Sequence, residues 1–320
     1  MAYKVILRNE MELDDLKMKI SLSETIDSIA YTANINIVVP EEMSKKLLLM
    51  EGDPVKIINM DTKKTVFEGV IWDKNTSNKH NKTATLQCKE RTIYIEESED
   101  EYLFKKGTTA TQRARQMCGD WGIPIGQFAD TKVPLAKAPP KINTIYSMML
   151  EDLRETAEKG GSLYRYRMQG KLELVEIGSN KVVHDITDTL EKIDQKGSLQ
   201  GAVSKVKVLG KKDDKKKSPV MGVFEKDTKK LGTLQKVIQD EKIKDNATAK
   251  KRAESLFSKG EGSISTSGID IPEIRAGDKV KLNGFHVYVT GVTHDLGEPG
   301  RMQLTLESLK QIRRKYYVRS

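Results

Sequence analysis

The chain has 320 residues, of which a low fraction of 37% is hydrophobic and a high fraction of 32% is charged. Charges of both signs are interspersed along much of the chain, which indicates a well-solvated surface and not a disordered polyampholyte. Lys and Arg outnumber Asp and Glu by 55 to 46, and this excess of +9 suits an anionic partner such as nucleic acid, a cell-wall polymer or an acidic subunit. The length predicts two or three domains.

Two cysteines, Cys88 and Cys118, exclude a disulfide framework and a zinc site of the multi-cysteine kind. No apolar run is long enough to predict a membrane span, and the opening "MAYKVILRNEMELDDL" has acids where a signal peptide needs an apolar core. We therefore expect synthesis in the cytoplasm without a signal peptide.

Residues 1–100 are predicted to form a small β barrel. Ile35 and Ile37 alternate with Asn34 and Asn36, and the runs "KTVFEGVIWD" and "TATLQCKERTIYI" continue this period of two. Short strands separated by polar turns are typical of a barrel or a sandwich.

Residues 101–184 are predicted to form an α+β module of two helices and a hairpin. Thr109 and Gln112 have the spacing of a capping box, and apolar residues follow at helical intervals. A second amphipathic helix is expected in "NTIYSMMLEDLRETAEKGG". The run "SLYRYRMQGKLELVEI" then predicts a hairpin that turns at Gln169-Gly170.

The last section repeats the first. The phrase "EGDPVKI", which starts at Glu51, returns as "AGDKVKL" from Ala276, each followed by a second strand. We predict a second, discontinuous β barrel from residues 185–210 and 261–310. Residues 211–260 form an insertion with a basic loop at 211–217 and a helix, and 311–320 form a basic tail. The predicted fold class is therefore α+β and β-rich, with two similar small barrels around an α+β module.

No pattern predicts catalytic residues, a cofactor site or a metal site. The four histidines lack metal-ligand spacing; His286 and His294 fall in one hairpin, where a cross-strand pair would still lack a third ligand. Phosphate-binding loops and nucleophile elbows are also missing from the sequence. The acidic run at 96–101 is interpreted as a solvated linker. The basic run at 211–217 is interpreted as a solvated loop, and the one at 313–315 as a solvated tail. The alternating Tyr and Arg residues of 164–167 are interpreted as a strand with one buried and one solvated face.

The order of these motifs resembles the central baseplate hub proteins of contractile phage tails and phage tail-like particles, of the PBSX-prophage XkdQ type. The matching pieces are "EGDPVKI…VFEGVI", "GTTATQRARQMCGDWGIPIG", "IYSMMLEDLRETAEKGGSLYRYRMQGKLELVEI" and "AKKRAESLFSKGEGSISTSGIDIPEIRAGDKVKLNGFHVYVTGVTHDL". Each motif is weak alone, and the resemblance rests on their order over residues 15–310.

The resemblance implies a non-enzymatic homotrimer in which each subunit supplies two similar barrels. Three chains then present six units to the hexameric tail tube, while the opposite end meets a trimeric spike. Tape-measure and other baseplate proteins are further candidate partners, and no cofactor is implied. The particle, which is a phage tail or a bacteriocin-like tail, would be released by lysis.

Under this reading the barrel turns carry equivalent positions at interfaces. The predicted interface residues are Gly52, Asp53, Gly69, Gly277, Asp278 and Gly291. Two other functions stay open: a tail-associated peptidoglycan hydrolase or peptidase whose carboxylates are assembled in space, and a nucleic-acid-binding module suggested by the net charge.

Overall fold

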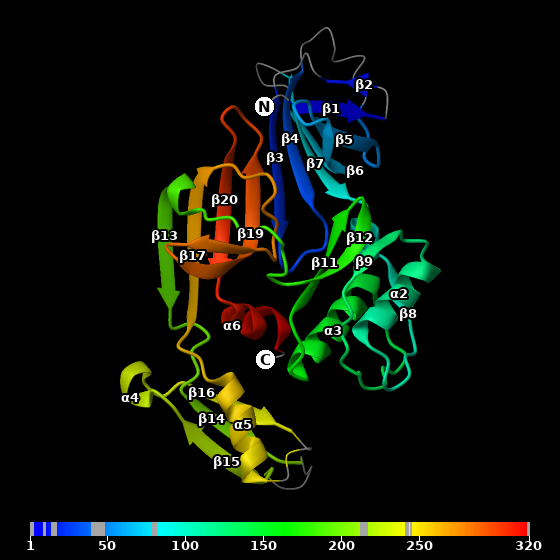
Figure 1. The fold of residues 1–320 in the computed structure, drawn as a ribbon. Helices are drawn as coiled ribbons and strands as arrows, with labels where there is room; N and C mark the ends of the chain where they lie inside the picture. Colours follow the sequence, from blue (N-terminus) through cyan, green and yellow to red (C-terminus); the bar gives the residue numbers. More distant parts are fainter. Residues whose placement is uncertain are drawn as a thin grey trace. The chain divides into compact units, whose positions relative to one another are not determined.

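A computed structural model describes residues 3–8, 11–13, 18–39, 49–77, 82–211, 217–240, 243 and 245–318. They belong to two compact units (Figure 1): unit 1, Met1–Asp194 with Ile264–Ser320, and unit 2, Gln195–Ser263. His80 and most of the predicted basic loop at 211–217 lie outside the described residues.

Unit 1 is built on a sheet of twelve strands. Their hydrogen-bonded order is β13-β17-β20-β19-β3-β4-β7-β6-β5-β1-β2, with β18 paired to β19. The strands are β1 (Tyr3–Leu7), β2 (Met11–Glu12), β3 (Met18–Thr25), β4 (Thr32–Val39), β5 (Pro54–Asn59), β6 (Lys64–Ser77), β7 (Lys82–Glu90), β13 (Leu190–Ser198), β17 (Glu261–Ile269), β18 (Lys279–Leu282), β19 (Phe285–Asp295) and β20 (Arg301–Glu307).

The predicted β-rich α+β fold class is confirmed, and one pairing was not anticipated. The two β halves share a single sheet because β3 pairs antiparallel with β19, with Thr25 opposite Gly291 and Ser21 opposite Asp295. Inward-facing residues at alternate positions form one apolar core in each half, as the period of two requires. The first core includes Ile35 and Ile37, which are at most 1% exposed.

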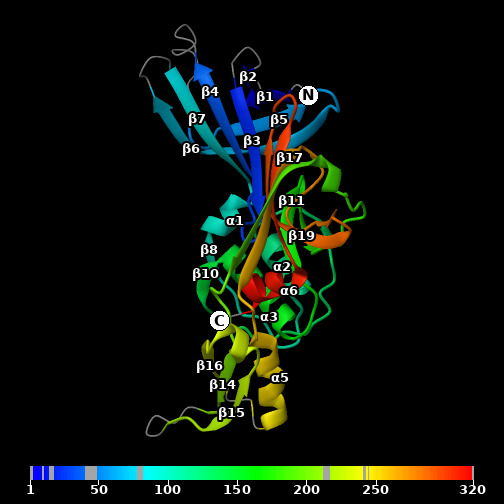
Figure 2. The ribbon, with the colours of Figure 1, turned by 90° about the vertical axis from the view of Figure 1, so that its left-hand side faces the viewer.

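The middle module packs helices against two small sheets (Figure 2). Its elements are α1 (Ile93–Glu97), β8 (Glu99–Glu101), α2 (Ala110–Asp120), β9 (Ile125–Phe128), β10 (Ile142–Thr144), α3 (Ile145–Glu158), β11 (Tyr164–Gln169) and β12 (Lys171–Glu176). The capping box is present as predicted: the Gln112 N–H donates to Thr109 Oγ1 and the Thr109 N–H donates to Gln112 Oε1. The predicted hairpin is β11–β12.

The prediction that the basic run at 313–315 is a solvated tail is wrong. After η2 (Thr187–Thr189) and the strands of the second half come α6 (Leu309–Ile312) and the π-helical turn η3 (Arg313–Tyr317), and η3 packs on α3. Arg313 donates to the carbonyls of Ala157 and Gly161 at 2.7 and 2.8 Å, and Tyr317 is buried. The Arg313 guanidinium thus ties η3 to the end of α3, where basic side chains commonly bond the last carbonyls of a helix.

Unit 2 is a three-stranded sheet with one long helix. It contains β14 (Lys205–Leu209), β15 (Val220–Glu225), α4 (Thr228–Leu231), β16 (Gln235–Gln239) and α5 (Asn246–Leu256), with β14 between β15 and β16. This assignment differs from the predicted limits of the insertion, because β14 had been expected in the second barrel. In the structure β17, not β14, follows β13 in the main sheet.

Candidate functional site

The Gly52-Asp53 turn is closed by a set of four backbone-directed hydrogen bonds. The Gly52 N–H donates to the Ile71 carbonyl at 2.8 Å, and the Ile71 N–H donates back to the Asp53 carbonyl at 2.9 Å. The Asp53 N–H reaches the Met50 carbonyl at 3.2 Å, while the Asp53 carboxylate accepts from the Met50 N–H at 2.9 Å. Gly52 has φ +88°, a left-handed conformation that favours glycine.

The Gly277-Asp278 turn repeats every one of these bonds. The Gly277 N–H donates to the Val289 carbonyl at 2.7 Å, and the Val289 N–H donates to the Asp278 carbonyl at 2.9 Å. The Asp278 N–H reaches the Arg275 carbonyl at 3.1 Å, and the Asp278 carboxylate accepts from the Arg275 N–H at 2.9 Å. Gly277 has φ +90°. The two turns are the same local structure built twice.

The repeat extends to the strand that follows each turn. Register shifts fall directly after the residue that bonds the turn, at Trp72 in β6 and at Thr290 in β19. Strand order also matches, since β5-β6-β7-β4-β3 corresponds to β18-β19-β20-β17-β13. By this order β17 corresponds to β4, and the insertion lies in the connection that corresponds to the short β3–β4 link.

Gly69 and Gly291 do not occupy matching positions in this repeat. Gly69 comes two residues before Ile71, whereas Gly291 comes two residues after Val289. Their surroundings differ accordingly: an added Cβ at Gly69 would lie 2.2 Å from the Lys89 carbonyl oxygen, and one at Gly291 would meet nothing within 3.7 Å. The shared "Gly-Val" letters that suggested the pairing are therefore out of register by four residues.

Each turn aspartate also faces an arginine from elsewhere in the chain. Arg8, which follows β1, contacts the Asp53 carboxylate at 2.8 Å and holds its pKa below the usual range. Arg167 of β11 lies 3.5 Å from the Asp278 carboxylate. Burial raises the pKa of Asp278, which is more enclosed than Asp53. The first turn is anchored within its own β half, and the second is anchored to the middle module.

A buried charge cluster joins the two β halves and the middle module within unit 1. Glu24 of β3 accepts from Arg165 of β11 at 3.0 Å and from Arg275 at 2.8 and 3.1 Å. The Ala276 N–H donates to the same carboxylate at 3.0 Å. Arg165 also bonds the Ala276 carbonyl, and Arg275 lies over the Tyr31 ring, with 4.2 Å to its centroid.

The cluster is electrostatically asymmetric. Burial alone would raise the pKa of Glu24, but Arg165 and Arg275 together with the donated hydrogen bonds lower it to about 2. Arg275 in turn has its pKa raised by Glu24 against the opposing effect of burial. Glu24 is therefore ionised at neutral pH, and one anion faces two guanidinium groups.

Sequence reasoning missed Arg165 because it interpreted the Tyr and Arg residues of 164–167 as a strand with one solvated face, and it assigned no role to Glu24 or Arg275. The structure contradicts that interpretation, since Arg165 is 2% exposed and Tyr166 on the opposite face is also 2% exposed. A strand covered on both faces offers no open platform for stacking bases. The alternation itself carried no signal of what covers each face of the strand.

Glu90, at the end of β7, is buried beside the same cluster, and burial raises its pKa to about 8. A folded-state pKa raised from 4.5 means that Glu90 favours the folded state below pH 4.5 and that this contribution is lost as pH rises through about 8. Glu90→Gln cannot titrate and keeps an acceptor for the Tyr31 N–H. We expect the variant to match wild type near pH 4.5 and to exceed its free energy of unfolding at pH 9 by on the order of 2 kcal/mol. Urea unfolding across this range measures the difference, and parallel curves would contradict it.

His286 and His294 are not placed as the sequence pattern suggested. His286 and His294 both lie in β19, with His286 opposite Lys281 of β18, so they are not a cross-strand pair. Buried His294 bonds the Asp270 carboxylate at 2.6 Å and the Ile274 carbonyl at 2.9 Å, which uses both ring nitrogens. In the described part of the chain no three His, Cys, Asp or Glu side chains are placed to hold a metal ion. No described helix combines the length and apolar character needed to cross a membrane.

Comparison with known proteins identifies the family of this chain. The model of the YQBQ-like family matches residues 18–307. The chain belongs to the YQBQ-like family. The family resemblance inferred from the ordered motifs is thereby confirmed, while no curated protein matches the sequence.

Solved structures share the fold of this YQBQ-like protein at low sequence identity. The 43 kDa tail protein of prophage MuSo2 from Shewanella oneidensis has a TM-score of 0.74 at 12% identity, over 97% of this chain and 98% of that one. A tail protein from Neisseria meningitidis MC58 has a TM-score of 0.69 at 14% identity, over 99% and 100%. The prophage tail protein gp18 from Listeria monocytogenes EGD-e has a TM-score of 0.57 at 12% identity, over 95% and 94%.

Proposed function

We propose that this protein is the structural hub of the baseplate in a contractile phage tail or phage tail-like particle. Its fold is shared over nearly the whole chain with proteins described as tail proteins of prophage MuSo2 and of Neisseria meningitidis. A family match over residues 18–307 is consistent with that role. The proposed role is architectural and non-enzymatic, and the particle would assemble after synthesis in the cytoplasm of the host cell.

The observation that carries the proposal is the repeated turn and hairpin. Both Gly-Asp turns make the same hydrogen bonds, and the strand order around them matches. A homotrimer of such chains presents six similar units although its true symmetry is threefold, which suits a hexameric tube on one side and a trimeric spike on the other. Under this proposal the two turns occupy equivalent places on the ring.

Contact with a spike protein is proposed on the same basis. A type VI secretion component of E. coli, c3393, described as similar to the T4 tail proteins gp27 and gp5, has a TM-score of 0.54 over 95% of this chain and 76% of its own. The Francisella PdpA-VgrG complex has a TM-score of 0.57 over the full length of this chain and 60% of its own. This chain matches 76% and 60% of these longer proteins, so part of each has no counterpart here. We propose that a separate spike protein supplies the missing part.

Native mass spectrometry and electron microscopy of the purified chain test the proposal. We expect a mass of three 36.0 kDa subunits and end-on views in which six similar densities surround a lumen with threefold symmetry. A closed ring of any other subunit number would contradict it. Clearing of purified peptidoglycan by the isolated protein would favour the hydrolase alternative instead.

A further inference from the structure

The net positive charge of the chain is confined to unit 2. Residues Gln195–Ser263 contain 18 Lys and Arg against 9 Asp and Glu, so this unit holds the whole excess of +9. The remaining residues balance, with 37 of 55 basic and 37 of 46 acidic side chains. A charge this unevenly distributed produces a local field that attracts an anionic partner.

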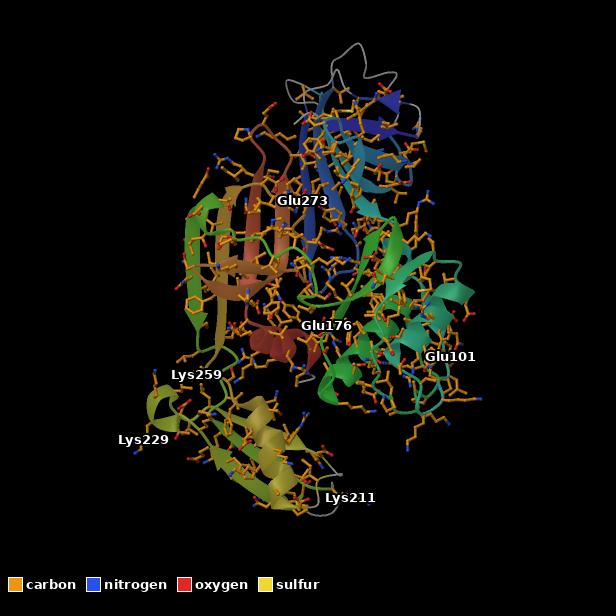
Figure 3. The ribbon with its side chains drawn as sticks, viewed as in Figure 1. Glu101, Glu176, Lys211, Lys229, Lys259 and Glu273 are labelled. Carbon is orange, nitrogen blue, oxygen red and sulfur yellow. The ribbon has the colours of Figure 1, made fainter. Side chains whose placement is uncertain are left out.

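The two faces of the unit 2 sheet differ in what covers them. Val206 and Val208 of β14 are completely buried, as are Ala249 and Ala253 of α5, so the helix covers the face to which these valines point. The side chains at the intervening positions of β14 point to the other face. Figure 3 labels three further basic residues of this unit, which are Lys211, Lys229 and Lys259.

The uncovered face combines lysine with exposed valines. Lys207 at its centre lies opposite Val223 of β15 and Val237 of β16, which are 46% and 49% exposed. Val220 is 53% exposed and pairs with Leu209 on the same face. Two exposed valines thus flank Lys207 in register and a third lies beside Leu209, so this face carries apolar side chains that α5 does not cover.

Lys207 is also electrostatically available. The neighbouring Lys205 is neutralised by Glu225, with 2.6 Å between its Nζ and a carboxylate oxygen. Among the described residues of the unit, none places a carboxylate within ion-pair distance of Lys207. The centre of the open face is thus a lysine ammonium group flanked by apolar surface.

We propose that this open face, defined by Lys207, Val220, Val223 and Val237, docks an acidic protein segment that carries apolar side chains between its carboxylates. The carboxylates match the charge of unit 2 and the apolar side chains cover the valines. A nucleic acid fits less well, because the unit has only two aromatic residues, Phe224 and Phe257, and Phe224 faces the helix side with Val206. Single-stranded nucleic acids use aromatic side chains as stacking platforms.

A peptide-binding experiment on the full-length protein tests this inference. The probe is a short fluorescein-labelled peptide of alternating glutamate and valine, and a single-stranded oligonucleotide of the same formal charge is the competing probe. We expect fluorescence anisotropy to show peptide binding that Lys207→Glu weakens about tenfold and that Val223→Thr with Val237→Thr weakens about fivefold. Thermal melting of each variant checks that unit 2 remains folded.

Lys250→Glu is the matched control, because it makes the same charge change on the exposed surface of α5. We expect it to weaken binding less than about twofold. Equal losses for Lys207→Glu and Lys250→Glu would overturn the proposal in favour of diffuse charge attraction. It would also be overturned by an absence of peptide binding, by valine variants that bind as wild type, by tighter binding of the oligonucleotide, or by self-association through this face.

Discussion

Glu24→Gln is expected to lower the free energy of unfolding by about 3–5 kcal/mol, the usual effect of removing one partner from a buried ion pair. The amide keeps the shape of the side chain, but it cannot neutralise Arg165 and Arg275 together. Both guanidinium groups then remain in a site where Glu24 and Arg165 are 1–2% exposed at the side chain. The loss is large because the unpaired charges stay buried, whereas the ion pair itself need not be strongly stabilising.

Urea unfolding at neutral pH measures this effect, and Glu68→Gln is the control. Glu68 pairs with Lys56 at 3.6 Å and is 61% exposed, so its loss is expected to change stability by less than about 1 kcal/mol. If the two variants lose similar stability, the Glu24 cluster does not hold the β halves to the middle module.

The same cluster predicts sensitivity to acid. The pKa of Glu24 falls from 4.5 to about 2 on folding, so its contribution is complete above pH 4.5 and is lost as pH falls towards 2. The deficit of Glu24→Gln relative to wild type is therefore expected to shrink over this range. A deficit that stays constant would show that the loss comes from packing and not from charge.

Local features of the fold were predictable from the sequence, and contacts between distant segments were not. A Gly-Asp turn or a capping box such as that of Thr109 is decided by residues within a few positions of one another, so its letters carry most of the information. Arg165 meets Glu24 across 141 positions, and nothing in the alternation of its strand says what covers each face. The buried cluster was therefore invisible to periodicity.

The assignment of β14 failed for a related reason. Val206 and Val208 alternate with lysines as a strand of the second barrel would, and they do form a strand. Periodicity predicts that one face is buried, but it does not say which sheet or helix buries it. Here α5 covers that face, while β17 takes the place beside β13. The RRK run at 313–315 likewise gave no sign that Arg313 would bond carbonyls at the end of α3.

Gly69→Ala and Gly291→Ala are expected to change stability in opposite directions. A methyl group at position 69 would lie 2.2 Å from the carbonyl oxygen and 2.7 Å from the carbonyl carbon of Lys89. These are backbone atoms of the paired strand β7, so relief requires the two strands to separate, and we expect a loss of about 3 kcal/mol or more. At position 291 the nearest atoms belong to Thr305 at 3.7 Å, an ordinary van der Waals contact.

Gly291 also has no positive φ, so alanine adopts its backbone conformation without strain and restricts the unfolded chain, which should stabilise the protein by about 0.4–1 kcal/mol. Thermal and urea unfolding measure the stability of both variants. If Gly69→Ala yields no soluble protein on expression, we interpret that result as the expected loss of stability. Similar losses at both positions would contradict the register deduced from the turns. Opposite signs would show that the two halves repeat the Gly-Asp turn but not the glycine in the strand that follows it. Only Gly69 is then required for close contact with the neighbouring strand.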